Sequence, residues 1–286
     1  MFKTLISAEQ LKPLSTAIIF DCRFELTHPQ AGVHAYSAAH IPGAHYAHLD
    51  EHLSDIKTGT NGRHPLPEAA ALIAFLRRCG VNNDSQMVAY DNHGGIFAAR
   101  LWWLARWLGH EAVAVLDGGL AAWQAHGGIT ASASAATPAA TPPRVTVAGN
   151  FSQRPTLQAA VTVENVLKNL TTQADLVIDA RPADRFRGEN ETIDPVAGHI
   201  PNAVNRFAKS NLQDNGCFKS AEQLREEWVA VLGAQTPAAS IAQCGSGAAA
   251  CHNLLAMEIA GLSGGKLYAG SWSEWCADPA RPVERG

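Results

Sequence analysis

Ile18-Ile19-Phe20-Asp21-Cys22-Arg23 is repeated 158 residues later as Leu176-Val177-Ile178-Asp179-Ala180-Arg181. Two further pairs follow in the same order, at offsets of 159 and 152 residues: HIPGA at 40–44 with HIPNA at 199–203, and DGGLAAW at 117–123 with AGSWSEW at 269–275. Three ordered matches at nearly constant spacing indicate that the chain contains two copies of one domain.

Each half alternates short apolar runs with helical patterns. We expect strands at 17–20, 87–90 and 176–179, and helices at 67–78, 98–108, 220–232 and 248–260. This alternation predicts an α/β fold, in which each half is a mainly parallel sheet with helices on both faces. We place the domains at 1–130 and 156–286. Between them, 131–155 is rich in small residues and proline and is expected to be a linker rather than an insert within one domain.

The composition excludes several classes of protein. Of 286 residues, 47% are hydrophobic and 17% charged, which is globular composition without an apolar run long enough to cross a bilayer. The first ten residues lack the apolar middle of a secretory signal, so we expect a cytoplasmic protein with no membrane partner. A net charge of −4 argues against binding nucleic acid. The six cysteines form no CxxC pair, so zinc is not expected and the thiols should be free.

One cysteine stands where chemistry is expected. The run SIAQCGSGAAA at 240–250 passes from a strand through a glycine-containing turn into a helix. The first half has VAYDNHGG at 88–95, so Asp91 corresponds to Cys244 at an offset of 153 residues. Gly245 and Gly247 let the backbone fold around the sulfur and turn its amides inward, and the following helix directs its positive end there. Such surroundings favour a thiolate, the form that attacks. The alternative for this short motif is a buried structural cysteine.

These motifs together resemble a known family. CGSG at 244–247, DAR with RFRG at 179–188, GHIPNAVN at 198–205 and GSWSEW at 270–275 are similar to the active half of the two-domain rhodanese-type thiosulfate and 3-mercaptopyruvate sulfurtransferases. The first half resembles the inactive half of the same family, whose cysteine is often replaced by Asp. The resemblance covers nearly the whole chain, and it implies two tandem rhodanese-like domains with catalysis in the second.

The resemblance also implies a reaction. Cys244 would take the outer sulfur of a small anionic donor, 3-mercaptopyruvate or thiosulfate, and hold it as a persulfide until cyanide or a thiol accepts it. Backbone donors of Gly245, Gly247, Ala248 and Ala249 would bind the persulfide. No metal and no organic cofactor is needed. We expect a monomer.

Particular side chains match the family's functional positions. Arg185 corresponds to the arginine that binds the donor's charged end, a task that suits a guanidinium, although most arginines form surface ion pairs. A second arginine, usual before GHIP in mercaptopyruvate enzymes, is missing from 191–197. Ser246, His64 and Glu51 match a proposed proton relay, with Asp55 a poorer choice for the acid; a lone His or loop Glu is more often an ordinary surface residue.

Two alternatives and the donor remain open. A cysteine phosphatase would need an arginine six residues after the cysteine, where this chain has Ala250. A non-catalytic sulfur-sensing or partner-binding module is the other alternative, and the presence of Cys244 argues against it. Gly245-Ser246 after the cysteine is typical of mercaptopyruvate enzymes rather than of thiosulfate enzymes, which carry basic residues there. We therefore favour 3-mercaptopyruvate slightly over thiosulfate.

Overall fold

The chain folds into two compact units. A computed structural model describes residues 1–132 and 147–286. The first unit comprises Met1–Asp55, Pro67–Leu157 and Asp214–Phe218, and the second comprises Ile56–Leu66, Gln158–Gln213 and Lys219–Gly286. The segment 56–66 therefore belongs to the second unit although it lies in the first half of the sequence. Most of the predicted linker, at 133–146, lies outside the described residues.

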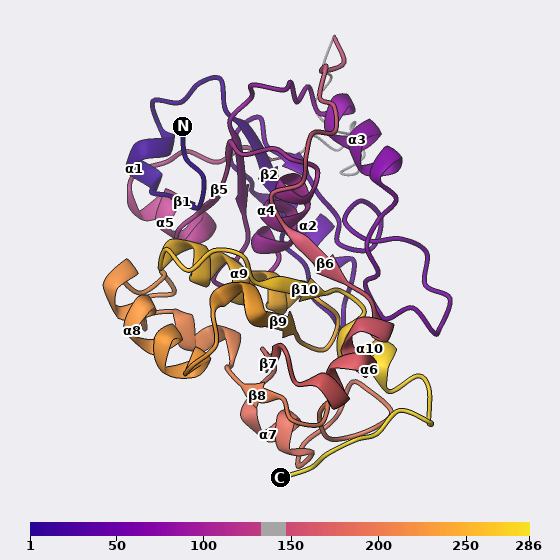
Figure 1. The fold of residues 1–286 in the computed structure, drawn as a ribbon. Coiled ribbons are helices and arrows are strands. Elements are labelled where there is room, and N and C mark those ends of the chain that lie inside the picture. Colours follow the sequence, from indigo (N-terminus) through magenta and orange to yellow (C-terminus); the bar gives the residue numbers. More distant parts are fainter. Residues whose placement is uncertain (133–146) are drawn as a thin grey trace. The chain divides into compact units, whose positions relative to one another are not determined.

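Each unit contains a five-stranded parallel sheet (Figure 1). The strands of the first sheet, in the order β1-β5-β4-β2-β3, are β1 (Leu5–Ile6), β2 (Ile18–Asp21), β3 (His45–Tyr46), β4 (Met87–Tyr90) and β5 (Val113–Leu116). The strands of the second sheet, in the order β6-β10-β9-β7-β8, are β6 (Ala159–Val161), β7 (Leu176–Asp179), β8 (Val204–Asn205), β9 (Ser240–Gln243) and β10 (Lys266–Tyr268). The two orders are equivalent, which confirms the duplication inferred from the sequence.

The helices also correspond between the units. Those of the first are α1 (Ala8–Leu11), α2 (Ala31–Ala38), α3 (Ala69–Arg78), α4 (Ala98–Trp107) and α5 (Gly119–Ala125). Those of the second are α6 (Val163–Thr172), α7 (Ala183–Arg187), α8 (Ala221–Leu232), α9 (Ala248–Ile259) and α10 (Ser271–Trp275), with short 3₁₀ helices at Ala208–Asn211 and Pro237–Ala239. The predicted helices and strands agree with these bounds to within two residues.

Helices cover both faces of each sheet. On β4, Val88 and Tyr90 join a buried cluster with Leu11 of α1 and Trp123 of α5. Because alternate strand residues point to opposite faces, Met87 and Ala89 turn to the other side, where α4 packs on β4 and β5. In the second unit, β7, β9 and β10 share a cluster with α6 and α10, and α9 packs on β9 and β10. Both sheets are therefore buried, as parallel sheets usually are.

A buried ion pair fixes the end of the second strand in each unit. Arg181 donates from Nε and Nη2 to the carboxylate of Asp179, and Nη2 also donates to the Gly198 carbonyl, 2.7 Å away. Arg23 and Asp21 make the same contacts in the first unit. Both carboxylates are fully buried. The repeated Asp-x-Arg motif thus ties β2 and β7 to the segments that carry the repeated His-Ile-Pro motif.

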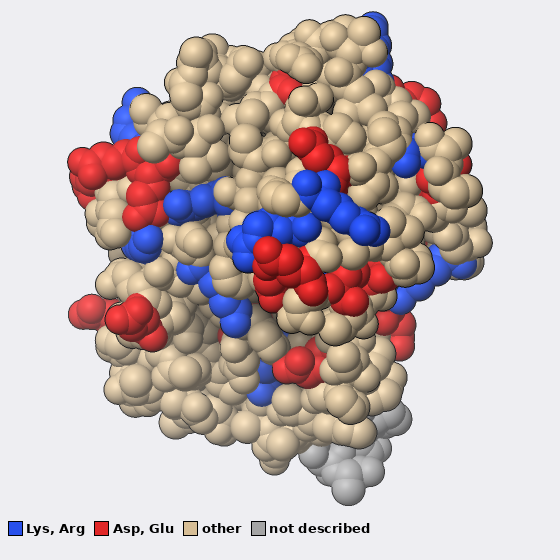
Figure 2. All heavy atoms as spheres, turned by 90° about the horizontal axis from the view of Figure 1, so that it is seen from below, with Lys and Arg blue, Asp and Glu red and all other residues tan. Residues whose placement is uncertain are grey.

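Charged side chains of both signs are exposed on the surface of the protein (Figure 2). On the face shown in Figure 2, Lys and Arg side chains lie beside Asp and Glu side chains and form no broad area of one charge. Among the helices formed by residues 1–132 and 147–286, none is long and apolar enough to cross a membrane.

Replacing Arg181 with Met should strongly destabilise the second unit. The substitution leaves Asp179 charged and buried without its partner, and breaking a buried pair in this way typically costs about 3–5 kcal/mol. The matched control is Glu189→Ala, which breaks the exposed pair of Arg187 with Glu189. Urea unfolding followed by tryptophan fluorescence should show a much lower midpoint for Arg181→Met and an unchanged midpoint for the control. Equal midpoints for the two variants would contradict the structural role assigned to the pair.

Candidate active site

Cys244 lies at the carboxyl end of the central strand of the second sheet. The chain leaves β7 toward β8 and leaves β9 toward β10, so its direction reverses between β7 and β9. Ligands of open parallel sheets collect at such points. The CGSG loop occupies this place and leads directly into α9.

Backbone amides surround the sulfur of Cys244. The amides of Ser246 and Gly247 donate to Sγ at 3.4 and 3.1 Å. Gly247 has φ +84°, and a Cβ at that position would lie 2.5 Å from the Ala269 carbonyl oxygen, so only glycine fits there. The sulfur also lies before the amino terminus of α9, a favourable place for negative charge. The residue is 3% exposed. The loop can therefore stabilise a thiolate or a persulfide anion by amide donation.

The AGSWSEW turn holds the loop in shape. The Ser271 hydroxyl accepts from the Cys244 amide at 3.1 Å and donates to the Tyr268 carbonyl. The amides of Trp272 and Ser273 donate to the carbonyls of Cys244 and Gly245 at 2.9 and 3.0 Å. Trp272 itself is fully buried in the core. The motif repeated near the end of each half thus orients the backbone of the cysteine loop, a role that its sequence alone did not reveal.

The predicted relay residues Ser246 and His64 are in contact. Nδ1 of His64 lies 2.7 Å from Oγ of Ser246, and both side chains are buried. His64 reaches this place because the segment 56–66 belongs to the second unit. Glu51 and Asp55 belong to the first unit, so a role for either acid stays a prediction. Ala248 and Ala249 form the first turn of α9, with Ala248 buried and Ala249 half-buried.

Arg185 lies beside the loop within a group of carboxylates. Its Nε and Nη2 donate to both oxygens of Glu191, and Nη2 also donates to Asp194 at 3.0 Å. Burial opposes ionisation of Glu191, but hydrogen bonds from the Asp194 amide and from Arg185 hold the pKa of Glu191 below its ordinary value. The segment 191–197, which lacks the second arginine, instead supplies two carboxylates that orient Arg185.

Sequence analysis missed Arg63, the neighbour of His64. Its Nη1 donates to Asp194 at 2.5 Å, and its backbone amide donates to Ser273 at 2.9 Å. A Cβ placed on Gly245 would lie 2.9 Å from Nη2 of Arg63 and 3.8 Å from the Nη atoms of Arg185. Two guanidinium groups therefore border the loop. Only the position of Arg63 beside His64 could have suggested this, because nothing in the spacing links residue 63 to residue 245.

Comparison with known proteins decides the family. The rhodanese-like domain model matches residues 3–126 and 162–278. The chain belongs to the rhodanese family. A Pseudomonas aeruginosa protein named "Probable 3-mercaptopyruvate sulfurtransferase" is 43% identical over 99% of this chain and 98% of its own length. The thiosulfate sulfurtransferase of Gallus gallus is 32% identical over 84% of this chain and 79% of its own length.

Solved structures agree on the rhodanese fold. The 3-mercaptopyruvate sulfurtransferase of Leishmania major has a TM-score of 0.84 at 28% identity and covers 98% of this chain and 75% of its own. Within the rhodanese family, this chain is therefore a two-domain member related to the thiosulfate and 3-mercaptopyruvate sulfurtransferases.

In the first unit, the side chain of Asp91 occupies the corresponding rhodanese loop. Oδ1 of Asp91 accepts from the amides of His93 and Gly95, and Oδ2 accepts from those of Phe97 and Ala98, at 2.7 to 2.9 Å. Asp91 is buried. The carboxylate thus takes the amide donors that an external anion would need, and the first unit offers no nucleophile at this position.

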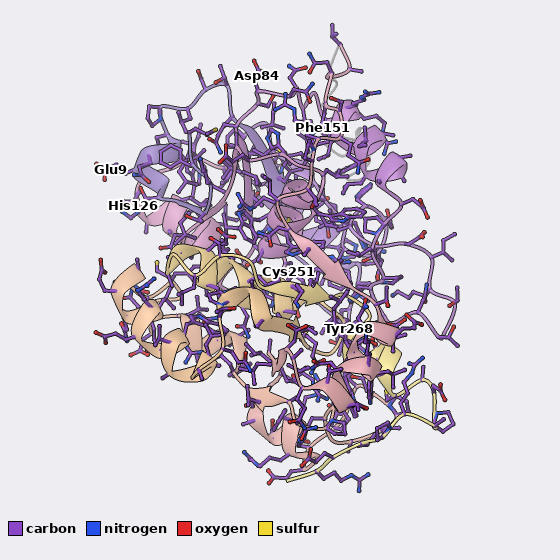
Figure 3. All side chains as sticks on the ribbon, in the orientation of Figure 1. Glu9, Asp84, His126, Phe151, Cys251 and Tyr268 are labelled. Atoms are coloured by element: carbon purple, nitrogen blue, oxygen red, sulfur yellow. The ribbon has the colours of Figure 1, made fainter. Side chains whose placement is uncertain are left out.

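Buried Cys251 lies apart from this chemistry. Figure 3 shows it on α9, and its thiol donates to the Gly247 carbonyl at 3.2 Å. This hydrogen bond links the first turn of α9 to the end of the cysteine loop.

Replacing Ser271 should reveal how the turn supports the loop. Ser271 has φ +55°, a strained value for a residue with a Cβ, and its counterpart Gly119 has φ +59°. Ser271→Ala retains the strain and leaves the buried Cys244 amide without its acceptor, which should cost about 1–3 kcal/mol. Ser271→Gly also loses the acceptor but relieves the strain, so it should be the more stable variant by about 1 kcal/mol. Urea unfolding of the two variants measures the difference, and a more stable Ser271→Ala would overturn this interpretation.

Proposed function

We propose that the chain is a sulfurtransferase that carries sulfur as a persulfide on Cys244, taking it from 3-mercaptopyruvate or thiosulfate. The observation that carries the proposal is a cysteine sulfur facing two backbone amides at the end of β9, before the amino terminus of α9. The relatives named as 3-mercaptopyruvate and thiosulfate sulfurtransferases support it.

In the first half-reaction, the Cys244 thiolate attacks the outer sulfur of the donor. With thiosulfate, the sulfur–sulfur bond breaks, its electron pair leaves with sulfite, and Cys244 becomes a persulfide anion. With 3-mercaptopyruvate, the carbon–sulfur bond breaks and its electron pair passes to carbon, which gives the enolate of pyruvate and then pyruvate on protonation. The amides of Ser246 and Gly247 would stabilise the charge on the persulfide.

In the second half-reaction, a nucleophilic acceptor attacks the outer sulfur of the persulfide. The bond between the two sulfur atoms breaks, its electron pair returns to Cys244 as a thiolate, and the acceptor leaves with one sulfur atom. Cyanide would leave as thiocyanate and a thiol as a persulfide. Neither half-reaction needs an external oxidant or reductant, so no metal or organic cofactor is invoked.

Ser246 and His64 are suited to proton transfer at this site. Their hydrogen bond of 2.7 Å links the loop hydroxyl to a buried imidazole. A mercaptopyruvate thiol loses its proton and the departing carbon gains one, whereas thiosulfate requires neither step. The relay would therefore serve 3-mercaptopyruvate in particular, with Glu51 as the proposed acid behind His64.

Replacing Cys244 with Ser should abolish sulfur transfer, because the hydroxyl cannot form a persulfide. Cys251→Ser, which alters a buried thiol on the helix that follows the cysteine loop, should retain most activity. Mass spectrometry of the wild type after incubation with donor should show one added sulfur atom on the peptide containing Cys244. Comparable loss of transfer in both variants would show that the nucleophile is misassigned.

We expect 3-mercaptopyruvate to be the better donor. Gly245-Ser246 and the Ser246–His64 contact support this preference, and they also predict that Ser246→Ala lowers kcat for 3-mercaptopyruvate more than for thiosulfate. Steady-state assays with cyanide as acceptor give kcat/KM for each donor. A much larger kcat/KM for thiosulfate, or an equal effect of Ser246→Ala on both donors, would reverse the assignment.

A further inference from the structure

Arg63 is held firmly at the cysteine loop by its own backbone. Gly62 has φ +84°, and a Cβ there would lie 2.7 Å from the Gly270 carbonyl oxygen, so the segment 56–66 packs directly on the AGSWSEW turn. The Arg63 amide donates to the Ser273 hydroxyl, and Ser273 in turn donates through its own amide to the Gly245 carbonyl. Arg63 and the loop are thus anchored to the same residue.

The Arg63 guanidinium is held by Asp194 through Nη1, while its Nη2 faces the loop. Asp194 joins the two arginines, because Oδ1 accepts from Arg63 and Oδ2 accepts from Arg185. The Asp194 side chain is 2% exposed, whereas those of Arg63 and Arg185 are 22% and 13% exposed. Among the described residues, Nη2 of Arg63 and Nη1 of Arg185 donate to no protein group. Both atoms therefore remain able to bind a ligand.

Because Gly245 has no side chain, the space beside the guanidinium groups of Arg63 and Arg185 stays open. Its φ is not in the left-handed region, so the backbone does not require glycine there. A side chain at 245 would instead meet Arg63 Nη2 first and the Arg185 guanidinium next. The glycine thus preserves a space next to the nucleophile that is bordered by two cations.

We propose that Arg63 is a donor-binding and specificity-determining residue that, with Arg185, binds the carboxylate of an α-keto acid donor over Gly245. This inference rests on the proposed sulfur transfer and names the donor class. Each guanidinium can donate to one oxygen of a planar carboxylate. In 3-mercaptopyruvate the carboxylate is separated from the reacting sulfur by two carbon atoms, so it can reach past Cys244 to the arginines. In thiosulfate only the central sulfur atom separates the charged oxygens from the reacting sulfur, so the oxygens remain closer to the amides of the loop.

The decisive variant is Arg63→Gln. A hydrogen bond to a charged group contributes about 1.5–3 kcal/mol, so KM for 3-mercaptopyruvate should rise about 10- to 100-fold while kcat changes little. KM for thiosulfate should change much less, and Arg63→Lys should recover part of the loss. The matched control is Arg187→Gln, because Arg187 pairs with Glu189 on the surface. Pyruvate, which carries the same carboxylate, serves as a competitive inhibitor, and its inhibition constant should rise by a similar factor in Arg63→Gln alone.

The outcomes separate this inference from the proposed function. If the wild type transfers sulfur but KM for 3-mercaptopyruvate is unchanged in Arg63→Gln, or rises equally in Arg187→Gln, Arg63 does not bind the donor. Failure of the wild type with both donors would instead overturn the proposed function, and calorimetric binding of pyruvate to wild type and Arg63→Gln would still test Arg63. If Arg63→Gln does not fold, Gly245→Ala decides: by filling the space it should raise KM for 3-mercaptopyruvate more than for thiosulfate, and equal effects would refute the proposal.

Discussion

The site depends on one constraint, namely that backbone amides in the turn after the central strand must converge on one acceptor side chain. A polypeptide does not hold such a turn unaided, because inward-pointing amides repel one another when no acceptor lies among them. Here the carbonyls on the outer side of the turn accept hydrogen bonds from the amides of Trp272 and Ser273, and the Cys244 amide is held by Ser271. The stability of the second core, which buries Trp272, is thereby used to maintain the geometry around the sulfur.

The two units meet this constraint in different ways. In the first, the Asp91 carboxylate accepts from four amides and satisfies the turn permanently. In the second, a neutral thiol or thiolate accepts from two, which leaves the loop able to stabilise further negative charge. The same fold thus gives one turn whose amides are occupied by its own side chain and one turn whose amides can bind an anion. The difference is set by the residue at the end of the strand, Asp91 or Cys244.

The sequence was sufficient for the architecture and for locating the loop that carries the proposed nucleophile. Repeated motifs revealed the duplication, and apolar runs bounded by glycine located β4, β7 and α9 because local periodicity determines them. Arg63 could not be found this way. Its importance comes from a long-range contact in which the segment 56–66 packs on the turn at 269–275, and no local pattern reports such a contact. His64 was found only because a family motif marks it.

The carboxylates near the loop were also missed, for an electrostatic reason. The segment 191–197 contains no arginine, and it contributes two anions instead, Glu191 and Asp194. A pair of guanidiniums brought together in a partly buried place would repel each other, and Asp194 removes that repulsion by accepting from both. The arginines are neutralised on one side and keep N–H donors on the other. Such a site attracts an anion by directed hydrogen bonds more than by net charge, so geometry can discriminate among anionic donors.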